Sequence, residues 1–510
     1  MGESDLLGLA ERSTVGLSRV PPLENRRPSV AFSDTGATRL GRAITARTSA
    51  HPGKSGIHAL RDARDAFAAR ALLAQAAERS LDVQYYIWRK DLTGTLLFES
   101  LHAAADRGVR VRLLLDDNNT SGLDTTLAAL DSHPNIEVRL FNPFVIRKLR
   151  ALGYLTDFQR LNRRMHNKSF TADNQATIVG GRNVGDEYFG ATHGVLFADL
   201  DLLAVGPVVY EVSSAFDRYW ASGSSYPAEW LLPPVGPARI DEVASAARQV
   251  TQGSAATAYT SALRDSSIVQ ELVKGTLELE WVSMRVVSDD PAKGLDLAAQ
   301  KDLVIHQLNR ILGEPAKELE LVSPYFVPTA AGVVWFTALA RRGVEVKVLT
   351  NSLEATDVVF VHSGYAKRRK PLLKEGITLY ELRRSVADPG SQKPTGGWGS
   401  SGASLHAKTF SVDRSRVFIG SFNFDPRSAK LNTEMGFVVE SPALAREMDT
   451  VFRSRVPADA YEVRSSQGGR LFWVERRRSE SFRHDTEPGT SVWRRTWVSL
   501  LSALPIEWLL

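Results

Sequence analysis

The sequence predicts an α/β protein of two similar lobes, each with a mixed, mainly parallel sheet flanked by helices. Three observations predict this class. Apolar runs typical of strands alternate with helical runs over most of the 510 residues. The order of these runs occurs twice along the chain, and a short pattern of polar residues recurs near the end of each repeat.

The first repeat opens with an apolar run at residues 81–88 that is typical of a strand. The apolar spacing from Leu96 to Ala105 then indicates a helix, which Gly108 ends, and residues 109–115 read as a second strand. The second half repeats strand, helix and strand. Its stop at 342–344 has the same Arg-Gly-Val sequence as residues 107–109, so we expect two copies of one plan.

A polar pattern, H-x-K-x-x-x-x-D, begins at His166 and returns 240 residues later at His406. In each copy a short strand and a glycine-containing turn follow, and an Asn lies 17 residues after the His. The residues of the two copies are His166, Lys168, Asp173 and Asn183, and His406, Lys408, Asp413 and Asn423. One such triplet is usually a solvated surface pair, but its return at equal offsets inside a wider repeat makes coincidence implausible.

An acidic residue leads the closing strand of each repeat. Asp199 precedes one strand and Glu434 the other, and a proline that begins the next helix follows each acid by eight residues. We therefore divide the chain into a mostly irregular N-terminal extension, a first lobe, a Pro-rich bridge, a second lobe and a C-terminal extension. Their boundaries are 1–59, 60–222, 223–299, 300–456 and 457–510.

The composition limits the chemistry. The chain has no cysteine, which excludes disulfides, thiolate metal sites, a Cys nucleophile and a lipidated Cys. Its net charge of +5 suits an anionic partner, either lipid phosphate or nucleic acid. No apolar run approaches the roughly 18 residues of a spanning helix, and the first 50 residues lack the apolar core of a signal peptide.

The His–Lys pairs favour an anion site. Residues i and i+2 of a strand share one face, so His166 and Lys168 should point the same way, as should His406 and Lys408. An ammonium group repels a metal cation but attracts phosphate, so we expect neither a metal nor a cofactor. We expect further phosphate ligands from the side-chain amides of the two asparagines and from the backbone N–H groups at Gly181 and Ser421.

Two imidazoles on opposite sides of one phosphate could take different roles in transfer of the phosphoryl group. One would attack phosphorus while the other protonates the leaving oxygen and later activates the incoming alcohol or water. A carboxylate on the far nitrogen of each ring would fix its tautomer, and Asp199 and Glu434 are the candidates. We assign both triplets to the catalytic centre, although Asp173 and Asp413 are more typical of residues that anchor a turn.

The doubled H-x-K-x-x-x-x-D pattern with its trailing Asn resembles the phospholipase D superfamily over nearly all of residues 60–456. The segments "DVQYYIW", "FADLDLLAVGPVV", "SPYFVP" and "LNTEMGFVVES" resemble the bacterial cardiolipin synthase branch, in its subgroup without N-terminal membrane spans. This resemblance implies a pseudo-twofold arrangement of the lobes and metal-free phosphatidyl transfer through a covalent phosphohistidine. It favours His166 as nucleophile and His406 as acid and base, an order that the residues alone do not set.

The chain departs from this branch at two places. Some members carry a lipoprotein Cys near the start, which this chain lacks, and many have Ser where this chain has Gly181. We expect a protein that is cytoplasmic or peripheral to the inner membrane, with phospholipid as substrate and no nucleic acid as partner; its oligomeric state stays open.

Two further segments bear on access to lipid. Residues 384–404 form a Gly/Ser-rich loop just before His406 and should govern what reaches it. The C-terminal segment holds Trp493, Trp497, Leu500, Leu501, Leu504 and Trp508 at helical spacing, so it is either an interfacial helix or a helix docked on the body.

Four functions fit the pattern to different degrees. Transfer of a phosphatidyl group to a glycerol-bearing acceptor, giving cardiolipin, is the leading hypothesis. Hydrolysis by a phospholipase D uses the same residues with water as acceptor. A nucleic-acid phosphodiesterase is weaker because no basic stripe alternates with stacking aromatics, and two intact triplets argue against a lipid-binding protein without activity.

Overall fold

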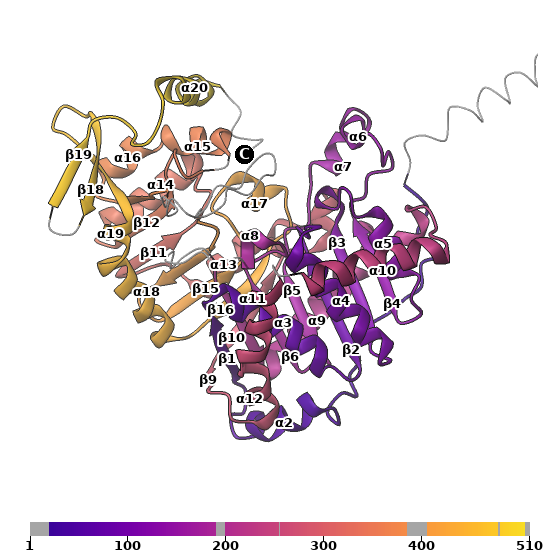
Figure 1. The fold of residues 1–510 in the computed structure, drawn as a ribbon. Coiled ribbons are helices and arrows are strands. Elements are labelled where there is room, and N and C mark those ends of the chain that lie inside the picture. The colour runs from indigo at the N-terminus through magenta and orange to yellow at the C-terminus, as the bar shows by residue number, and fades with distance from the viewer. Residues whose placement is uncertain are drawn as a thin grey trace, which may run out of the picture.

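A computed structural model of the chain describes residues 20–189, 199–253, 256–356, 358–384, 405–477 and 480–504. It contains two large mixed sheets with helices packed on them, one from each half of the chain, lying side by side (Figure 1). The two-lobe α/β class predicted from the sequence is therefore confirmed. Residues 385–404 of the predicted access loop, and Trp508, lie outside the described residues.

The first sheet has the spatial order β8-β4-β3-β2-β5-β6-β7-β1-β9. Its strands are β8 (Ser225–Pro227), β4 (Ile136–Phe141), β3 (Arg110–Asp116), β2 (Ser80–Tyr85), β5 (Ser169–Ala172), β6 (Ala176–Gly180), β7 (Asp201–Val205), β1 (Ser55–Leu60) and β9 (Glu280–Val282).

The second sheet has the order β10-β16-β15-β14-β11-β12-β13-β17-β18-β19. Its strands are β10 (Met284–Ser288), β16 (Met435–Val439), β15 (Arg416–Gly420), β14 (Thr409–Val412), β11 (Glu318–Val322), β12 (Glu345–Asn351), β13 (Thr378–Leu382), β17 (Ala460–Ser465), β18 (Leu471–Arg477) and β19 (Glu480–His484). The order β4-β3-β2-β5-β6-β7 of the first lobe is matched by β13-β12-β11-β14-β15-β16, which is the internal repeat seen in three dimensions.

Parallel pairing is more restricted than the sequence suggested. Among the described strands it joins only β2–β3–β4 in the first sheet and β11–β12–β13 in the second. The remaining neighbours are antiparallel, among them β5–β6 and β14–β15, where each polar triplet ends in a tight hairpin instead of a crossover helix. The hairpin residues Asp173 and Asn174, with φ of 51° and 52°, and Asp413 and Arg414, with φ of 52° and 51°, make the two turns.

The helices lie on the sheet faces and at the strand ends. The described ones are α2 (Arg39–Ser49), α3 (Ala63–Ala76), α4 (Leu92–Asp106), α5 (Asp124–Asp131), α6 (Arg150–Thr156), α7 (Phe158–Leu161), α8 (Asp186–Phe189), α9 (Pro207–Trp220), α10 (Pro237–Gln252), α11 (Thr257–Asp265), α12 (Ile268–Lys274), α13 (Val304–Leu312), α14 (Thr329–Arg341), α15 (Val359–Ala366), α16 (Arg369–Lys374), α17 (Pro426–Lys430), α18 (Pro442–Ser454), α19 (Val456–Asp459) and α20 (Val492–Ala503).

The predicted helix signals act as expected. Asp91 caps α4 by accepting a hydrogen bond from the backbone N–H of Gly94, and Gly108 follows the helix at a φ of 89° that favours glycine. Gly343 plays the same part after α14 at a φ of 85°. Pro207 and Pro442 are the first residues of α9 and α18.

A shared apolar core joins the lobes. Buried side chains of β6 and β7, among them Val179 and Leu202, belong to one cluster with those of β15 and β16, among them Ile419 and Phe437. Figure 1 shows these central strands meeting where the two halves adjoin. Burial of this cluster holds the two repeats together through strands of the triplet hairpins, β6 and β15, and their neighbours β7 and β16.

Strands and helices of the described residues also lie outside the two predicted lobes. The N-terminal extension is not irregular throughout, because α2 and β1 fall within residues 1–59 and β1 pairs with β7. The bridge 223–299 supplies β8 and β9 to the first sheet and β10 to the second. After residue 457, β17 to β19 extend the second sheet. Within the described residues, no helix is both long and apolar enough to cross a membrane.

Candidate active site

The two triplets meet where the lobes join. Met165 forms a backbone bridge to Thr433 of the other half, and the backbone N–H of His166 donates to the carbonyl of Thr433 at 2.8 Å. Thr433 and Glu434 directly precede β16, so this contact places His166 next to Glu434, the acid of the second repeat.

His166 is bonded to the carboxylate of the opposite lobe. Its Nδ1 lies 2.8 Å from Oε2 of Glu434 and 3.1 Å from the carbonyl oxygen of Ser421. A carbonyl oxygen only accepts, so Nδ1 carries the hydrogen and Nε2 of the neutral ring carries the lone pair. The side chain of His166 is 8% exposed.

His406 shows the reciprocal arrangement. Its Nδ1 donates to Oδ2 of Asp199, at the start of β7 in the first lobe, at 2.5 Å. The side chain of His406 is 28% exposed and is therefore more accessible than that of His166. Each imidazole is thus held by the acid of the other repeat, and the expected pairing of a carboxylate with each ring is found in a crossed form.

The two lysines lie in the same site. Lys168 donates to the backbone carbonyl of His166, and Lys408 to that of His406. Burial lowers the pKa of His166 well below its usual value, and the nearby charges of Lys168 and Lys408 lower it further. Because lysines of both halves act on one imidazole, the two triplets form a single centre.

The acids differ in their ionisation. Burial raises the pKa of Glu434 to about 7, against the opposing charge of Lys168. Burial also acts to raise the pKa of Asp199, but the charge and hydrogen bond of His406 outweigh it and bring that pKa to about 2. The pKa of His406 is lowered by burial and by Lys408, while Asp199 acts in the opposite direction.

Asn183 and Asn423 both lie in this buried region. Oδ1 of Asn183 accepts from the backbone N–H of Ile87 at 3.2 Å, while its buried Nδ2 has no hydrogen-bond partner within the described residues. Oδ1 of Asn423 is likewise buried without a partner there. A buried amide with an unused group is costly, which favours a ligand that satisfies it.

Comparisons with known proteins identify the family of this chain. A family model described as "Cardiolipin synthase, PLD-like domain" matches residues 70–220 and 308–456. Cardiolipin synthase C of Escherichia coli K12 is 51% identical over 472 residues, which cover 92% of this chain and all of that protein. The chain belongs to the cardiolipin synthase, phospholipase D-like family.

More distant relatives share the same plan. A cardiolipin synthase of Geobacillus kaustophilus is 26% identical over 445 residues, which cover 85% of this chain and 70% of that protein. Among solved structures, the phosphatidylserine synthase of Haemophilus influenzae Rd KW20 superposes with a TM-score of 0.59 at 12% identity, covering 91% of this chain and all of that one. This second likeness concerns the fold alone.

Two predicted phosphate ligands of this family member serve another purpose. The backbone N–H of Gly181 donates to the carbonyl of Leu200 at 3.2 Å, and that of Ser421 to Met435 at 2.9 Å, so sheet pairing already uses both donors. The hydroxyl of Ser421 donates to Oε2 of Glu434. Their role as phosphate ligands stays a prediction, to which these two N–H groups do not contribute in this structure.

Asp173 and Asp413 do not face the imidazoles. The carboxylate of Asp173 accepts from the backbone N–H groups of residues 78–80, just before β2, at 2.7 to 3.2 Å. Asp413 accepts from residues 316–318, just before β11, at 2.7 to 3.1 Å. Their interpretation as turn anchors fits these contacts, and their place among the catalytic residues stays a prediction.

Sequence reasoning missed Asp289, which lies in the bridge. Its Oδ2 accepts from the backbone N–H of Glu434 at 2.8 Å and pairs with Nζ of Lys293 at 2.8 Å. The acid of His166 is thereby held by a residue outside both repeats. No local pattern marked Asp289, since its partner lies 145 residues away.

An aromatic ring stands against each histidine. Tyr86 packs edge-on to His166 with ring centroids 4.9 Å apart, and Tyr188 packs edge-on to His406 at 5.1 Å. Neither tyrosine was singled out from the sequence. They do not occupy matching places in the repeats, so the internal symmetry could not reveal them.

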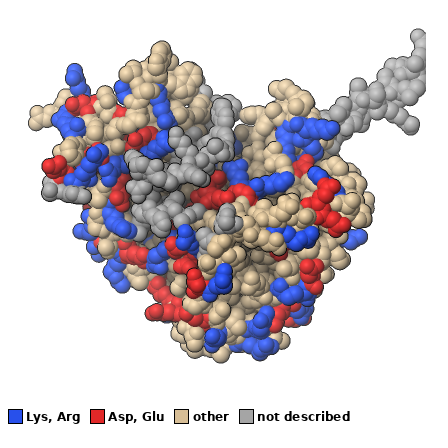
Figure 2. All heavy atoms as spheres, viewed as in Figure 1, with Lys and Arg blue, Asp and Glu red and all other residues tan. Residues whose placement is uncertain are grey.

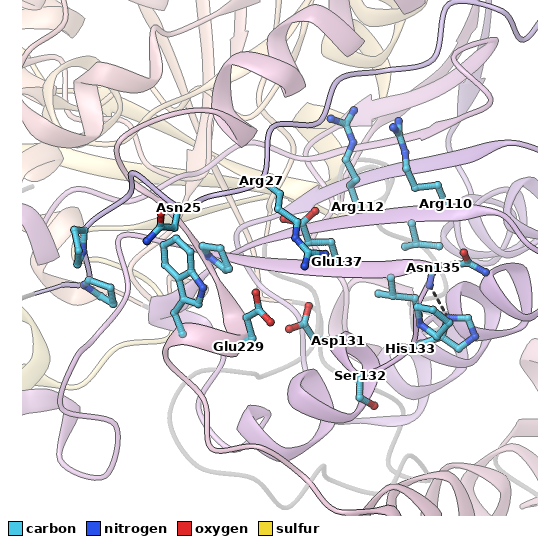
Figure 3. Close-up of a pocket in the computed structure, with 17 residues that line it drawn as sticks. Asn25, Arg27, Arg110, Arg112, Asp131, Ser132, His133, Asn135, Glu137 and Glu229 are labelled. Atoms are coloured by element: carbon cyan, nitrogen blue, oxygen red, sulfur yellow. Dashed lines mark hydrogen bonds between the residues drawn. The ribbon is translucent and has the colours of Figure 1, made fainter.

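A separate cavity of about 880 Å³ lies at the other end of the first sheet. It opens beside Val111 and Ile136, at the amino ends of β3 and β4, and Figure 3 shows Asp131 and Glu229 facing each other in it. None of the predicted site residues lines it. The predicted catalytic groups lie instead near the carboxyl ends of the parallel strands, where open α/β sheets bind ligands.

Proposed function

We propose that this chain is a phosphatidyltransferase that makes cardiolipin from phosphatidylglycerol and a second phospholipid, through a phosphohistidine intermediate. The observation that carries the proposal is the pair of crossed imidazole–carboxylate contacts, His166 with Glu434 and His406 with Asp199, in one buried centre. Membership of the cardiolipin synthase family and the 51% identity to cardiolipin synthase C support the choice of reaction.

In the first step Nε2 of His166 attacks the phosphorus of the donor lipid. The bond from phosphorus to the headgroup oxygen breaks, and protonated His406 gives its proton to that oxygen. The lowered pKa of His166 keeps its ring neutral near pH 7, so its lone pair is available. The greater exposure of His406 suits a group that meets leaving and entering alcohols.

In the second step His406, now neutral, accepts the proton of a glycerol hydroxyl on the acceptor lipid. The alcohol oxygen attacks phosphorus, the phosphorus–nitrogen bond breaks, and His166 is restored. Asp199 stabilises the imidazolium of His406 each time it forms, because its low pKa keeps it ionised. We expect Lys168, Lys408 and the amide Nδ2 groups of Asn183 and Asn423 to hold the non-bridging oxygens; that of Asn183 has no partner within the described residues.

The acceptor and donor lie in a bilayer, and α20 is the first candidate for contact with it. One side of α20 is docked on the body, since Ser502 donates to the carbonyl of Ser363 in α15 at 2.8 Å and Val498 is buried. Its other side exposes Trp493 at 84% and Trp497 at 58%. The segment is therefore a helix docked on the body, and its outer face also suits a membrane interface.

A lipid product profile tests the function. Purified protein is incubated with phosphatidylglycerol, alone and mixed with phosphatidylethanolamine, and the products are identified by mass spectrometry. We expect cardiolipin and a released glycerol or ethanolamine headgroup, and His166→Ala should reduce turnover by more than about a thousandfold. Release of headgroup with phosphatidic acid as the main product would replace transfer by hydrolysis, and no product at all would refute both.

A further inference from the structure

Helices α6 and α7 form a protrusion on the first lobe that exposes apolar side chains. Leu149 is 63% exposed, Leu152 44%, Leu155 83% and Phe158 46%. Four large apolar side chains within ten residues make a patch, which on a soluble surface marks an interaction site. We call residues 149–158 the α6–α7 tip.

The tip is built rigidly despite its exposure. Arg147 at its base forms ion pairs with Asp117 and Asp124, and Arg150 also binds Asp124, at 3.0 Å. The hydroxyl of Tyr154 donates to Oδ1 of Asn118 at 3.0 Å. These contacts hold the apolar side chains outward. Exposure of apolar side chains to water is unfavourable, so this arrangement indicates that the tip is covered by a partner.

The tip lies at the same sheet edge as the catalytic centre. Strands β2, β3 and β4 are parallel, so their carboxyl ends share one edge. Tyr86, which contacts His166, follows β2, and the tip follows β4. The chain runs directly from the end of α7 at Leu161 to His166, five residues later.

Helix α20 occupies the corresponding edge of the second lobe. It packs on α15, which follows the carboxyl end of β12 in the parallel group β11–β12–β13. In Figure 1, α6 and α20 project on the same side of the molecule, on either side of the junction between the lobes.

Charge accompanies both apolar elements. Lys148 is exposed next to Leu149, and Arg494 and Arg495 lie beside Trp493 on α20. Figure 2 shows uncharged atoms at both projections with Lys and Arg atoms close beneath them. Apolar groups above a basic belt match a bilayer with anionic headgroups, into which the apolar groups insert while the bases meet phosphates.

We propose that the α6–α7 tip is a membrane-docking element that inserts into an anionic bilayer, on the other side of the junction between the lobes from α20. The proposal rests on the proposed function for the choice of a lipid bilayer as the occupant. Docking at two points on either side of this junction sets the catalytic edge against the lipid surface, so a donor headgroup enters between the tip and α20 and reaches His166 without leaving the interface.

Vesicle binding tests the proposal with a matched pair of variants. Leu155→Asp places a charge at the tip, and Val30→Asp makes the same change at a side chain that is 65% exposed at the opposite edge, where Arg110 at the start of β3 contacts its carbonyl. Both are made in a His166→Ala background so that lipid turnover does not alter the vesicles. With phosphatidylglycerol-containing vesicles, we expect Leu155→Asp to weaken binding about tenfold and Val30→Asp to change it less than about twofold. Equal binding of the two variants would overturn the proposal.

The absence of cysteine allows a direct probe of insertion. A single Leu155→Cys variant labelled with an environment-sensitive fluorophore should shift its emission to the blue on these vesicles, while a labelled Val30→Cys variant should not. An unshifted Leu155 label on protein that sediments with vesicles would place the bilayer elsewhere. A dimer in solution that Leu155→Asp dissociates would identify a second copy as the occupant and also overturn the proposal.

A third measurement separates this proposal from the reaction itself. Leu155→Asp in the active protein should retain wild-type turnover of substrate dispersed in detergent and lose turnover of substrate in vesicles. Loss of both would assign the residue to folding or chemistry and refute docking. Failure of the wild type on dispersed substrate would refute the proposed function, whatever the vesicle binding shows.

Discussion

At position 181 the lack of a side chain decides where Asp199 can lie. A Cβ there would come within 2.0 Å of Oδ1 of Asp199, whose other oxygen, Oδ2, accepts from His406. The matching Ser421 instead supplies a hydroxyl that donates to the longer Glu434. The two repeats thus position the acid differently: the shorter Asp199 lies against a glycine, and the longer Glu434 accepts from a serine hydroxyl.

Gly181→Ala should therefore impair catalysis through Asp199. The added methyl displaces the carboxylate, His406 loses the partner that raises its pKa, and less of it is protonated at a given pH. We expect turnover to fall about a hundredfold and the alkaline limb of the pH–rate profile to move to lower pH. Gly36→Ala is the control, because a Cβ at Gly36 meets nothing within 4 Å. An unshifted limb would show that Asp199 does not tune His406.

Asp413→Asn should affect stability and leave catalysis nearly intact. Burial acts to raise the pKa of Asp413, but hydrogen bonds from three backbone N–H groups outweigh it and lower that pKa, so the folded state favours the carboxylate. This stabilisation is present above the unfolded pKa of about 3.9 and is lost as pH falls through the lower folded pKa.

Denaturant unfolding measures this contribution. At pH 7 we expect Asp413→Asn to lower the free energy of unfolding by about 1–3 kcal/mol, and the gap to the wild type to narrow below about pH 4. Turnover should stay within about twofold of the wild type because the carboxylate binds backbone and not substrate. A loss of turnover in a variant of unchanged stability would instead support a place for Asp413 in the catalytic set.

Among the elements, the order of strands and helices could be predicted because it is written locally. The helix from Leu92 to Asp106 and the strand from Arg110 to Asp116 follow from apolar spacing and from Gly108. The share of parallel pairing could not be predicted in this way, since it depends on which strands meet. The antiparallel β5–β6 and β14–β15 hairpins needed the positive φ at Asp173 and Asp413 to be foreseen.

Asp289 in the bridge could not be predicted either, because its partner Glu434 is distant along the chain. Asp289→Asn weakens the acceptor for the backbone of Glu434 and leaves Lys293 without its ion pair. We expect turnover to fall about tenfold with little change in KM, because the acid of His166 moves while the lipid site is kept. The neighbouring Asp290→Asn, whose carboxylate accepts from Ala292 before a short helix, is the control and should have no such effect. Equal turnover of both variants would contradict a positioning role for Asp289.

For the whole molecule, the central feature is that neither repeat contains a complete site. His166 needs Glu434, His406 needs Asp199, and the apolar core of β6, β7, β15 and β16 holds the halves in register. The sequence predicted both histidines and both acids from their matched offsets. It could not predict that each histidine bonds to the acid of the other repeat. The offsets along the chain are the same whether a histidine pairs with the acid of its own repeat or with that of the other.

The central claim is that His166 carries the phosphatidyl group while His406 moves protons. The most direct measurement uses a phosphatidyl ester whose leaving group, such as p-nitrophenol, departs without an acid, and peptide mass spectrometry of the protein after mixing. In His406→Ala, the account predicts that phosphatidyl accumulates on the peptide containing His166, because the step that needs a base is blocked. An adduct on His406 in the His166→Ala variant, or no adduct in either variant, would contradict it.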